Sequence, residues 1–313
     1  TNDAPVYTHG YAFVSISVNT ALDKSQPDFF ESDIPPSGTL DVAQPRVYFG
    51  EASPLYSIVG APEGTPSVEL DYPDDASPTG QKTNTYQGTG GVSMGSLFGR
   101  ALFATKFQDV NILLSDLVNS DSRIMWDRDP LTRVEKVAPW LTLDQDPYAV
   151  VAEGRIKWIV DGYTMSNDYP YSSRVSLSDA TADSISTRTL PAQLQPNDQI
   201  NYMRNSVKAV VDAYDGTVTL YAWDPSDPVL QTWMKAFPGV VQPASQMPQS
   251  IEAHVRYPQD QFKVQRTIMS RYHVTDASTF YNGTDVWIVP DDPTVSAGQV
   301  FQPPYYLTLE MPG

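Results

Sequence analysis

The chain has 313 residues, with 20 basic and 37 acidic side chains and a formal net charge of −17 at pH 7. A protein with this charge repels phosphate backbones, so we expect no nucleic acid among its partners. The sequence contains no cysteine, which excludes thiolate catalysis, disulfides and cysteine-based zinc sites. No apolar run reaches about eighteen residues, so we expect no membrane-spanning helix within it.

The first third of the chain predicts short strands and then a helix. Apolar and polar residues alternate from 12 to 18, which predicts a half-buried strand with Val14, Ile16 and Val18 on its buried face. Short strands are expected at 46–49 and 56–59, whereas the polar, proline-broken stretch 70–89 predicts a loop. From Leu97 towards Val118 the apolar spacing changes to three and four residues, which predicts a helix.

Two tight hairpins are predicted in the middle of the chain. Residues 148–164 contain a turn at Glu153-Gly154 that places Val151 opposite Ile156. Residues 207–223 contain Asp215-Gly216, a strong signal for a two-residue turn. This turn predicts three core pairs: Ala213/Val218, Val211/Leu220 and Ala209/Ala222. The Ser- and Thr-rich stretch between the hairpins, 164–200, predicts a long surface excursion.

Further helices are predicted at two Asp-Pro pairs and near the end of the chain. Asp129-Pro130 and Asp227-Pro228 combine an N-cap side chain with a proline at the first helical position. Helical spacing returns at 251–255 and 262–272, with a break at Tyr257-Pro258, and 286–289 predicts a strand. No pattern closes the fold at Gly313, so we expect a truncated C-terminus.

These elements together predict an α+β fold. Antiparallel hairpins and short strands pack against several helices, and 27 prolines and many turns make the chain rich in loops. We expect a single domain over residues 1–313, with a two-lobed organisation left open.

Several sequence words resemble a known bacterial family. They are YTHGY at 7–11, GRIKWIVDGYT at 154–164, YPYS at 169–172, NYMRNSVKAVVDAYDGTVTLYAWD at 201–224, RYPQDQFKVQR at 256–266 and YHVTDASTFY at 272–281. They are similar to uncharacterised protein family 0182, which comprises large multi-pass membrane proteins of unknown function. The resemblance implies that this chain is most of an extracytoplasmic region that follows a block of transmembrane helices. It supplies no catalytic residue.

The sharpest catalytic motif is Gly91-Val92-Ser93-Met94-Gly95, which matches the G-x-S-x-G elbow of serine hydrolases. A predicted helix follows the motif, but no buried apolar strand precedes it. A glycine loop in which Ser93 or Ser96 caps the helix explains the same residues. Ser93 is therefore a weak candidate nucleophile, and a pair of carboxylates remains the alternative for a hydrolase.

Oxygen-rich pairs suggest a metal only weakly. Asp127 with Asp129, and Asp144 with Asp146, could bind Ca²⁺, although two of these acids precede proline and fit capping or turn roles. No cofactor is expected, and Ca²⁺ is the one metal ion left open.

Two basic groups and a pair of aromatic residues are candidates for an anion or ligand site. The first basic group is Arg123, Arg128 and Arg133, and the second is Arg256, Lys263 and Arg266. The aromatic candidates are Tyr221 and Trp223. Ion pairing with the abundant aspartates is the alternative for the basic residues, and aromatic packing is the alternative for the other two.

These observations favour a non-catalytic binding or interaction module on the extracytoplasmic side of the cell membrane. Its expected partners are the transmembrane block of the same protein and an envelope glycan, lipid or protein. An envelope hydrolase that uses serine or carboxylates is the alternative.

Overall fold

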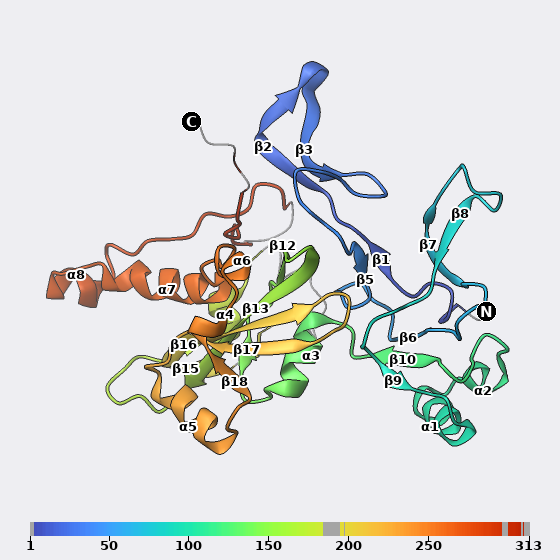
Figure 1. Cartoon of the computed structure of the whole chain (residues 1–313). Helices are drawn as coiled ribbons and strands as arrows, with labels where there is room; N and C mark the ends of the chain where they lie inside the picture. Colours follow the sequence, from blue (N-terminus) through green and yellow to red (C-terminus); the bar gives the residue numbers. More distant parts are fainter. Residues whose placement is uncertain (1–2, 184–194, 197, 296–299, 308, 310–313) are drawn as a thin grey trace.

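The computed structural model describes residues 3–183, 195–196, 198–295, 300–307 and 309 (Figure 1). It has the predicted α+β architecture, in which helices pack with several small and mostly antiparallel sheets. Whether the chain is one domain or two lobes remains a prediction.

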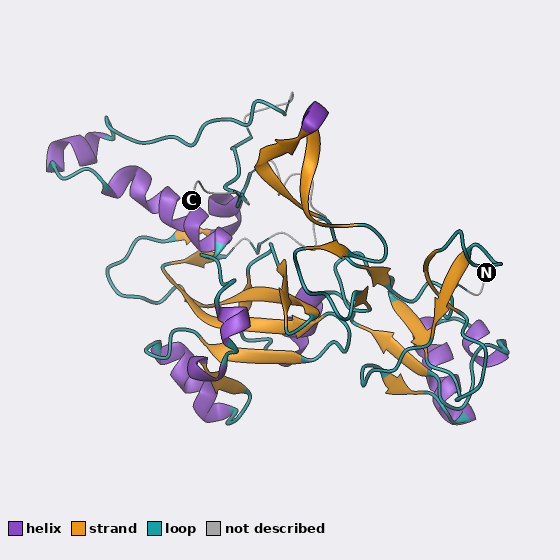
Figure 2. Ribbon diagram, turned by 45° about the horizontal axis from the view of Figure 1, so that its top comes forward, coloured by secondary structure: helices purple, strands orange, loops and turns teal. Residues whose placement is uncertain are grey.

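A six-stranded sheet forms the largest layer (Figure 2). Its strand order is β11-β13-β16-β17-β18, and β12 also pairs with β13. Only β17 and β18 run parallel, and the helix α5 connects them. The strands are β11 (Thr142–Leu143), β12 (Tyr148–Ala152), β13 (Arg155–Ser166), β16 (Tyr202–Asp212), β17 (Val218–Ala222) and β18 (Val241–Pro243).

The two central hairpins differ in how well their register was predicted. In β12–β13, Val151 pairs with Ile156 as expected. In β16–β17, Val211 pairs with Val218 and not with Leu220. The prediction was wrong by two residues because the turn is longer, with Gly216 N donating to Asp212 O at 2.8 Å. A shift of two residues preserves the faces of both strands.

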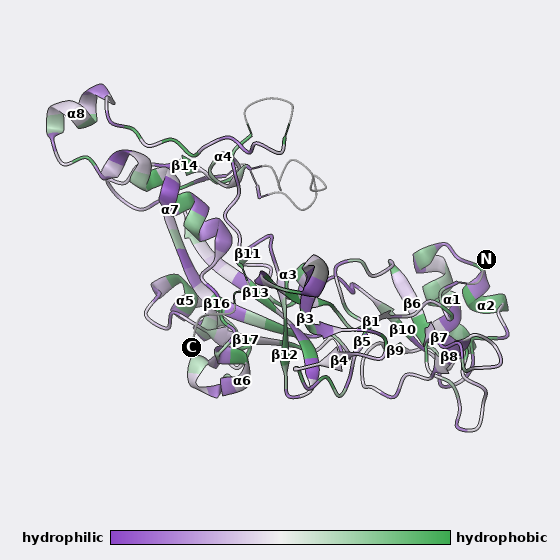
Figure 3. Ribbon diagram, turned by 90° about the horizontal axis from the view of Figure 1, so that it is seen from above, coloured by the Kyte–Doolittle hydropathy of each residue, from purple (hydrophilic) through white to green (hydrophobic). Residues whose placement is uncertain are grey.

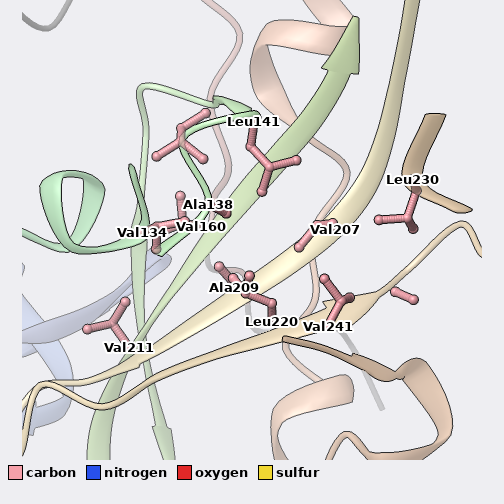
Figure 4. Close-up of a cluster of buried hydrophobic side chains, with 12 residues drawn as sticks. Val134, Ala138, Leu141, Val160, Val207, Ala209, Val211, Leu220, Leu230 and Val241 are labelled. Atoms are coloured by element: carbon pink, nitrogen blue, oxygen red, sulfur yellow. The ribbon is translucent and has the colours of Figure 1, made fainter. Parts of the chain in front are cut away.

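Both faces of this sheet bury apolar side chains. On one face, valines and alanines of β13, β16 and β17 pack against α3 (Pro130–Val137) and α5 (Pro228–Ala236). Figure 4 shows this cluster, including Val134, Val160, Val207 and Leu230. The opposite face packs against Ile251 of α6 (Gln249–Glu252).

Helices α3 and α5 begin where the Asp-Pro pairs predicted. The Asp129 side chain accepts a hydrogen bond from Thr132 N at 2.8 Å. The Asp227 side chain accepts from Leu230 N at 3.0 Å. In each case a proline occupies the first turn, where its missing N–H has no cost.

In the N-terminal part, the described residues form four small sheets and two α-helices. The first pair is β1 (Gly10–Tyr11) with β5 (Arg46–Val47), and the second pair is β7 (Glu69–Pro73) with β8 (Gln81–Asn84). A third sheet has the order β6 (Tyr56–Val59), β10 (Arg123–Trp126), β9 (Val92–Ser93). The fourth has the order β2 (Ser15–Leu22), β3 (Gln26–Ser32), β4 (Ser37–Gly38). The helices are α1 (Leu97–Phe107) and α2 (Asn111–Leu114).

Two predictions for residues 70–118 were wrong. Residues 70–89 are not a loop throughout, because β7 and β8 pair across them. The helix that begins at Leu97 ends at Phe107, because Gln108 adopts a left-handed conformation with φ 53°. Asp109 then accepts a hydrogen bond from Asn111 N at 2.9 Å, and the separate helix α2 follows.

The C-terminal part packs a long helix beside the sheet. The long helix is α7 (Gln259–Tyr272), and the shorter α8 (Ala277–Asn282) follows it. The break before α7 falls at Pro258 as predicted. The 164–200 excursion contains β14 (Val175–Ser176), α4 (Leu177–Thr181) and β15 (Gln199–Ile200), while residues 184–194 and 197 lie outside the described ranges. The strand expected at 286–289 is absent there, and Trp287 and Ile288 are exposed.

The strands β2 and β3 project from the rest of the molecule as an arm, joined at the tip by the short helix η1 (Asp23–Ser25) (Figures 1 and 2). We call residues 14–32 the arm. The predicted buried face of β2 is wrong: Val14, Ile16 and Val18 are 66%, 41% and 52% exposed, while Ser17 is 5% exposed. The alternation is real, but the described chain does not cover its apolar face.

Candidate functional site

Ser93 ends the short edge strand β9 and lies four residues before α1. It is exposed, and in the described chain its hydroxyl makes one hydrogen bond, accepted from Gly95 N at 3.5 Å. Ser96, not Ser93, caps α1 through Gly99 N at 3.0 Å. Gly91 has φ +76°, and a Cβ there would lie 2.9 Å from the Ile124 carbonyl, so this glycine allows β9 to approach β10. The motif therefore has a structural explanation.

The proposed metal ligands have other roles. Asp129 caps α3, and Asp127 holds a left-handed backbone conformation with φ 48° just before it. Asp144 Oδ1 accepts a hydrogen bond from Asp146 N at 3.0 Å. Among the residues that the structure describes, no group of three or more His, Cys, Asp or Glu side chains is placed to hold a metal ion.

Asp144 instead belongs to a buried polar cluster between the six-stranded sheet and α7. Its Oδ2 accepts hydrogen bonds from Tyr163 OH at 2.5 Å and from Asp260 N at 2.9 Å. Asp144 and Asp260 are 2% and 3% exposed. Burial, reinforced by the nearby Asp260 carboxylate, raises the pKa of Asp144 to about 7.

Two lysines provide the positive charge of this cluster. Lys263 Nζ lies 2.8 Å from Asp183 Oδ2 and 3.2 Å from Asp260 Oδ1. Lys208 pairs with Asp161 and also donates to the Arg256 carbonyl at 3.1 Å. The cluster joins the sheet to α7 through hydrogen bonds, such as the one that Gln261 N donates to Tyr163 OH at 3.3 Å. Its carboxylates are too buried to meet a substrate in this conformation.

A histidine network that sequence reasoning did not single out lies in the N-terminal part. His9 Nε2 is 3.0 Å from Asp71 Oδ1, and Asp71 also binds Arg46 through two hydrogen bonds of 2.7 Å. Thr8 Oγ1 lies 2.8 Å from His9 Nδ1 and donates to Glu69 at 2.9 Å. Burial lowers the pKa of His9, while Asp71 and Glu69 oppose this shift. His9 lies in the YTHGY word, which is the one signal that pointed to it.

The basic residues of the first group, Arg123, Arg128 and Arg133, donate hydrogen bonds to backbone carbonyl oxygens. Arg123 donates to the carbonyls of Gly90 at 2.7 Å and Gly91 at 2.8 Å. Arg128 is 3% exposed and donates to Tyr48 O at 2.6 Å, and its burial lowers its pKa to about 10. Neither Arg123 nor Arg128 forms an ion pair within the described ranges, so the alternative of ion pairing with aspartates is wrong for them.

The second basic group lies elsewhere, so the two groups do not form one site. Lys263 belongs to the buried cluster, and the Arg256 guanidinium lies over the Tyr148 ring at 4.6 Å from its centroid. Arg266 Nη1 donates to the Gln302 carbonyl at 3.2 Å. Lys208, which contacts Arg256, points to the sheet face opposite the one that α3 covers.

The aromatic candidates separate as well. Tyr221 is buried in the cluster beside Ile251, so it packs and does not form an exposed stacking platform. Trp223 is about one-third exposed, and Lys208 Nζ lies 5.5 Å from the centroid of its ring.

Two of the clefts in the described surface lie beside candidate residues or stacked aromatic rings. One of about 380 Å³ lies between Tyr169, the start of β16 and α7, and there Tyr169 stacks on Tyr202 with ring centroids 6.1 Å apart. The other, of about 280 Å³, lies between β9, β10 and α3 and includes the candidate Arg133.

Exposed apolar side chains gather on projecting elements. On the arm, Ile16 pairs with Phe29 of β3, and both are exposed. Leu97, Phe98 and Leu102 of α1 are also exposed, and Figure 3 marks hydrophobic residues on this helix. Along the described ranges, every helix is either too short or too polar to cross a lipid bilayer.

Comparison with known proteins identifies relatives over the whole length of this chain. A protein of Leifsonia xyli named UPF0182 protein Lxx09300 is 54% identical over 313 residues, which are 100% of this chain and 31% of the relative. A UPF0182 protein of Arthrobacter sp. is 53% identical over 98% of this chain and 31% of its own length. The chain thus spans about three tenths of the length of these relatives. No solved structure gives a significant match.

The family match agrees with these relatives and with the resemblance of the sequence words. It extends over residues 1–313. The chain belongs to the Uncharacterised protein family (UPF0182).

Proposed function

We propose that this chain is a non-catalytic interaction module of a cell-envelope membrane protein and that its arm binds the remainder of the same polypeptide. The observation that carries the proposal is the exposed apolar face of β2, formed by Val14, Ile16 and Val18. The extracytoplasmic location rests on the family resemblance of the sequence.

An alternating strand of this kind is typical of a sheet that buries one face. Transferring one Val or Ile side chain from water to an apolar contact contributes about 1.5–3 kcal/mol. In the described fold β2 is also the edge of its sheet, with β3 on one side only. A free edge can pair with another strand, so the arm offers both main-chain and apolar contacts.

The size of the relatives argues for the remainder of the polypeptide as the occupant. This chain corresponds to 31% of the Leifsonia and Arthrobacter relatives, so most of each relative lies outside the matched region. A contact within one polypeptide also avoids much of the entropic cost of bringing two molecules together.

The polar clusters support a non-catalytic role. Ser93 has no hydrogen bond to a histidine or carboxylate among the described residues. The carboxylates of Asp144 and Asp260 are enclosed and hydrogen-bonded. No observation favours the hydrolase over the interaction module.

Site-specific photo-crosslinking in a full-length relative tests the arm. A photoreactive amino acid at the position equivalent to Ile16 or Val18 should form crosslinks to segments of the same polypeptide outside this region. The exposed Gln81 of β8 is the matched control position, because it also lies on a projecting hairpin but is polar. Equal crosslinking from both positions, or none from the arm, would contradict the proposal.

Activity assays test the non-catalytic part separately. The chain should not hydrolyse envelope esters or glycans. Turnover that Ser93→Ala abolishes would instead establish the serine hydrolase.

A further inference from the structure

The cleft between β9, β10 and α3 has an apolar interior. Its volume is about 280 Å³, and the buried residues Phe49, Ile124 and Met125 are among those that line it. Val92 and Val137 also line it and are each nearly half exposed. This volume lies just below the range of about 300–1,000 Å³ typical of drug-sized ligands, so the cleft fits a smaller molecule.

Two cations on α3 line the same cleft. Arg133 is held in place because Nε donates to Gly216 O at 2.7 Å and Nη1 to Asp127 O at 3.2 Å. Its guanidinium also covers the Phe49 ring at 4.4 Å from the centroid. These contacts fix the guanidinium but leave Nη2 without a hydrogen bond to any described residue.

Lys136 lies one helical turn after Arg133 and makes no hydrogen bond, ion pair or ring contact with the described part of the chain. Asp127 is the only acidic side chain among the described residues that line the cleft. The lining therefore carries a net positive charge on a protein whose overall charge is −17. The positive lining should therefore attract an anion, although the protein as a whole repels anions.

The apolar lining and the two cations together indicate which kind of ligand fits the cleft. The apolar lining favours a ligand with a hydrocarbon or aromatic body. The oriented Arg133 guanidinium favours a carboxylate, which can accept charge-assisted hydrogen bonds from it. A single negative charge matches the net charge of the lining.

We propose that this cleft binds a small amphipathic carboxylate. Its apolar body lies against Val92 and Val137, which line the cleft and are accessible, and its carboxylate lies between Arg133 and Lys136. This site is independent of the arm and of the interaction that we propose for it.

Titration of this chain with 4-phenylbutyrate tests the proposal, and 4-phenylbutanamide is the neutral control ligand. Isothermal calorimetry and ligand-observed NMR should detect the carboxylate, with the amide binding at least about tenfold more weakly. Because Lys136 is exposed, binding should also weaken as salt is added. Equal binding of acid and amide, or no binding of the acid at millimolar concentration, would overturn the proposal.

A charge-reversal pair locates the site. Lys136→Glu should reduce the affinity for phenylbutyrate at least about tenfold. Lys235→Glu is the matched control, because Lys235 is likewise exposed in the last turn of a helix, α5, and does not line the cleft. Both variants should remain folded. Unchanged affinity in Lys136→Glu, or an equal loss in both variants, would place the ligand elsewhere and contradict the assignment.

Discussion

At the scale of single residues, Asp144 shows how packing changes ionisation. The carboxyl is buried beside Asp260, which raises its pKa from 3.8 to about 7. Between these two values the folded protein holds a proton that the unfolded chain has released. The contribution of Asp144 to the free energy of unfolding therefore falls as pH rises through this window.

Asp144→Asn tests this linkage. The neutral amide cannot titrate, so the free energy of unfolding should depend less steeply on pH between about 4 and 7 than in the unsubstituted protein. Urea unfolding at a series of pH values measures the difference. The same change at the exposed Asp41 should leave the slope unaltered, and an unaltered slope in Asp144→Asn would contradict the interpretation.

The Lys208–Asp161 pair gives a second residue-scale prediction. Lys208 is fully buried, and Asp161 is 4% exposed. Lys208→Met should lower the free energy of unfolding by about 3–5 kcal/mol, because it leaves a buried carboxylate without its cation. Lys208→Met combined with Asp161→Leu should recover part of this loss. Chemical denaturation measures both variants, and a double variant less stable than the single one would exclude this explanation.

At the scale of elements, the arm shows that a strand can alternate between apolar and polar residues while its apolar face stays exposed. Ile16→Thr with Val18→Thr should change the free energy of unfolding of this chain by less than about 0.5 kcal/mol per residue, because both side chains are exposed. The same changes should suppress arm-dependent crosslinking in a full-length relative. Calorimetry of the chain provides the first measurement, and a loss above about 2 kcal/mol would mean that the arm is packed against this chain itself.

Elements whose determinants lie close together in the sequence could be predicted. The Glu153-Gly154 hairpin and the Asp-Pro helix starts depend on neighbouring residues, and the structure contains both. The exposed face of β2 could not be predicted, because alternation does not reveal which surface covers a strand. The strands within residues 70–89 were not predicted because β7 and β8 are short and largely polar, with little of the apolar alternation that marks a strand.

The buried cluster could not be assembled from the sequence for a related reason. Asp144 and Asp260 are separated by 116 positions, and no spacing rule joins them. Asp144 was noticed as one of a pair with Asp146, which suggested a metal, whereas its main partners are Tyr163 and Asp260. The basic groups were visible as composition, but only the fold shows that Arg123 and Arg128 bind carbonyl groups.

At the scale of the whole molecule, the turn between β16 and β17 connects the N-terminal part to the six-stranded sheet. Phe49 N donates to Ala213 O at 2.9 Å, and Thr89 N donates to Asp215 Oδ1 at 2.8 Å. Gly216 has φ +69°, and a Cβ there would lie 2.6 Å from the Phe49 ring. The turn therefore requires glycine for both conformation and space.

Gly216→Ala should lower the free energy of unfolding by at least about 2 kcal/mol, since it combines backbone strain with a clash against Phe49. Gly239→Ala is the matched control, because Gly239 has φ +84° but a Cβ there would meet no atom within 4 Å, so it reports backbone strain alone. Thermal and urea unfolding of both variants give the comparison. Equal losses would show that the Phe49 contact is unimportant.

Arg128 has a consequence for anyone who shortens this protein for expression. Its guanidinium binds Thr8 O at 2.5 Å, Ser57 Oγ at 2.5 Å and Tyr48 O at 2.6 Å, so one side chain ties together three distant stretches. A fragment that begins after Thr8 would lack the Thr8 carbonyl, so the buried Arg128 guanidinium would lose one of its hydrogen-bond acceptors. Fragment boundaries should therefore keep the first ten residues, even though Gly10 is the one strand residue among those that the structure describes there.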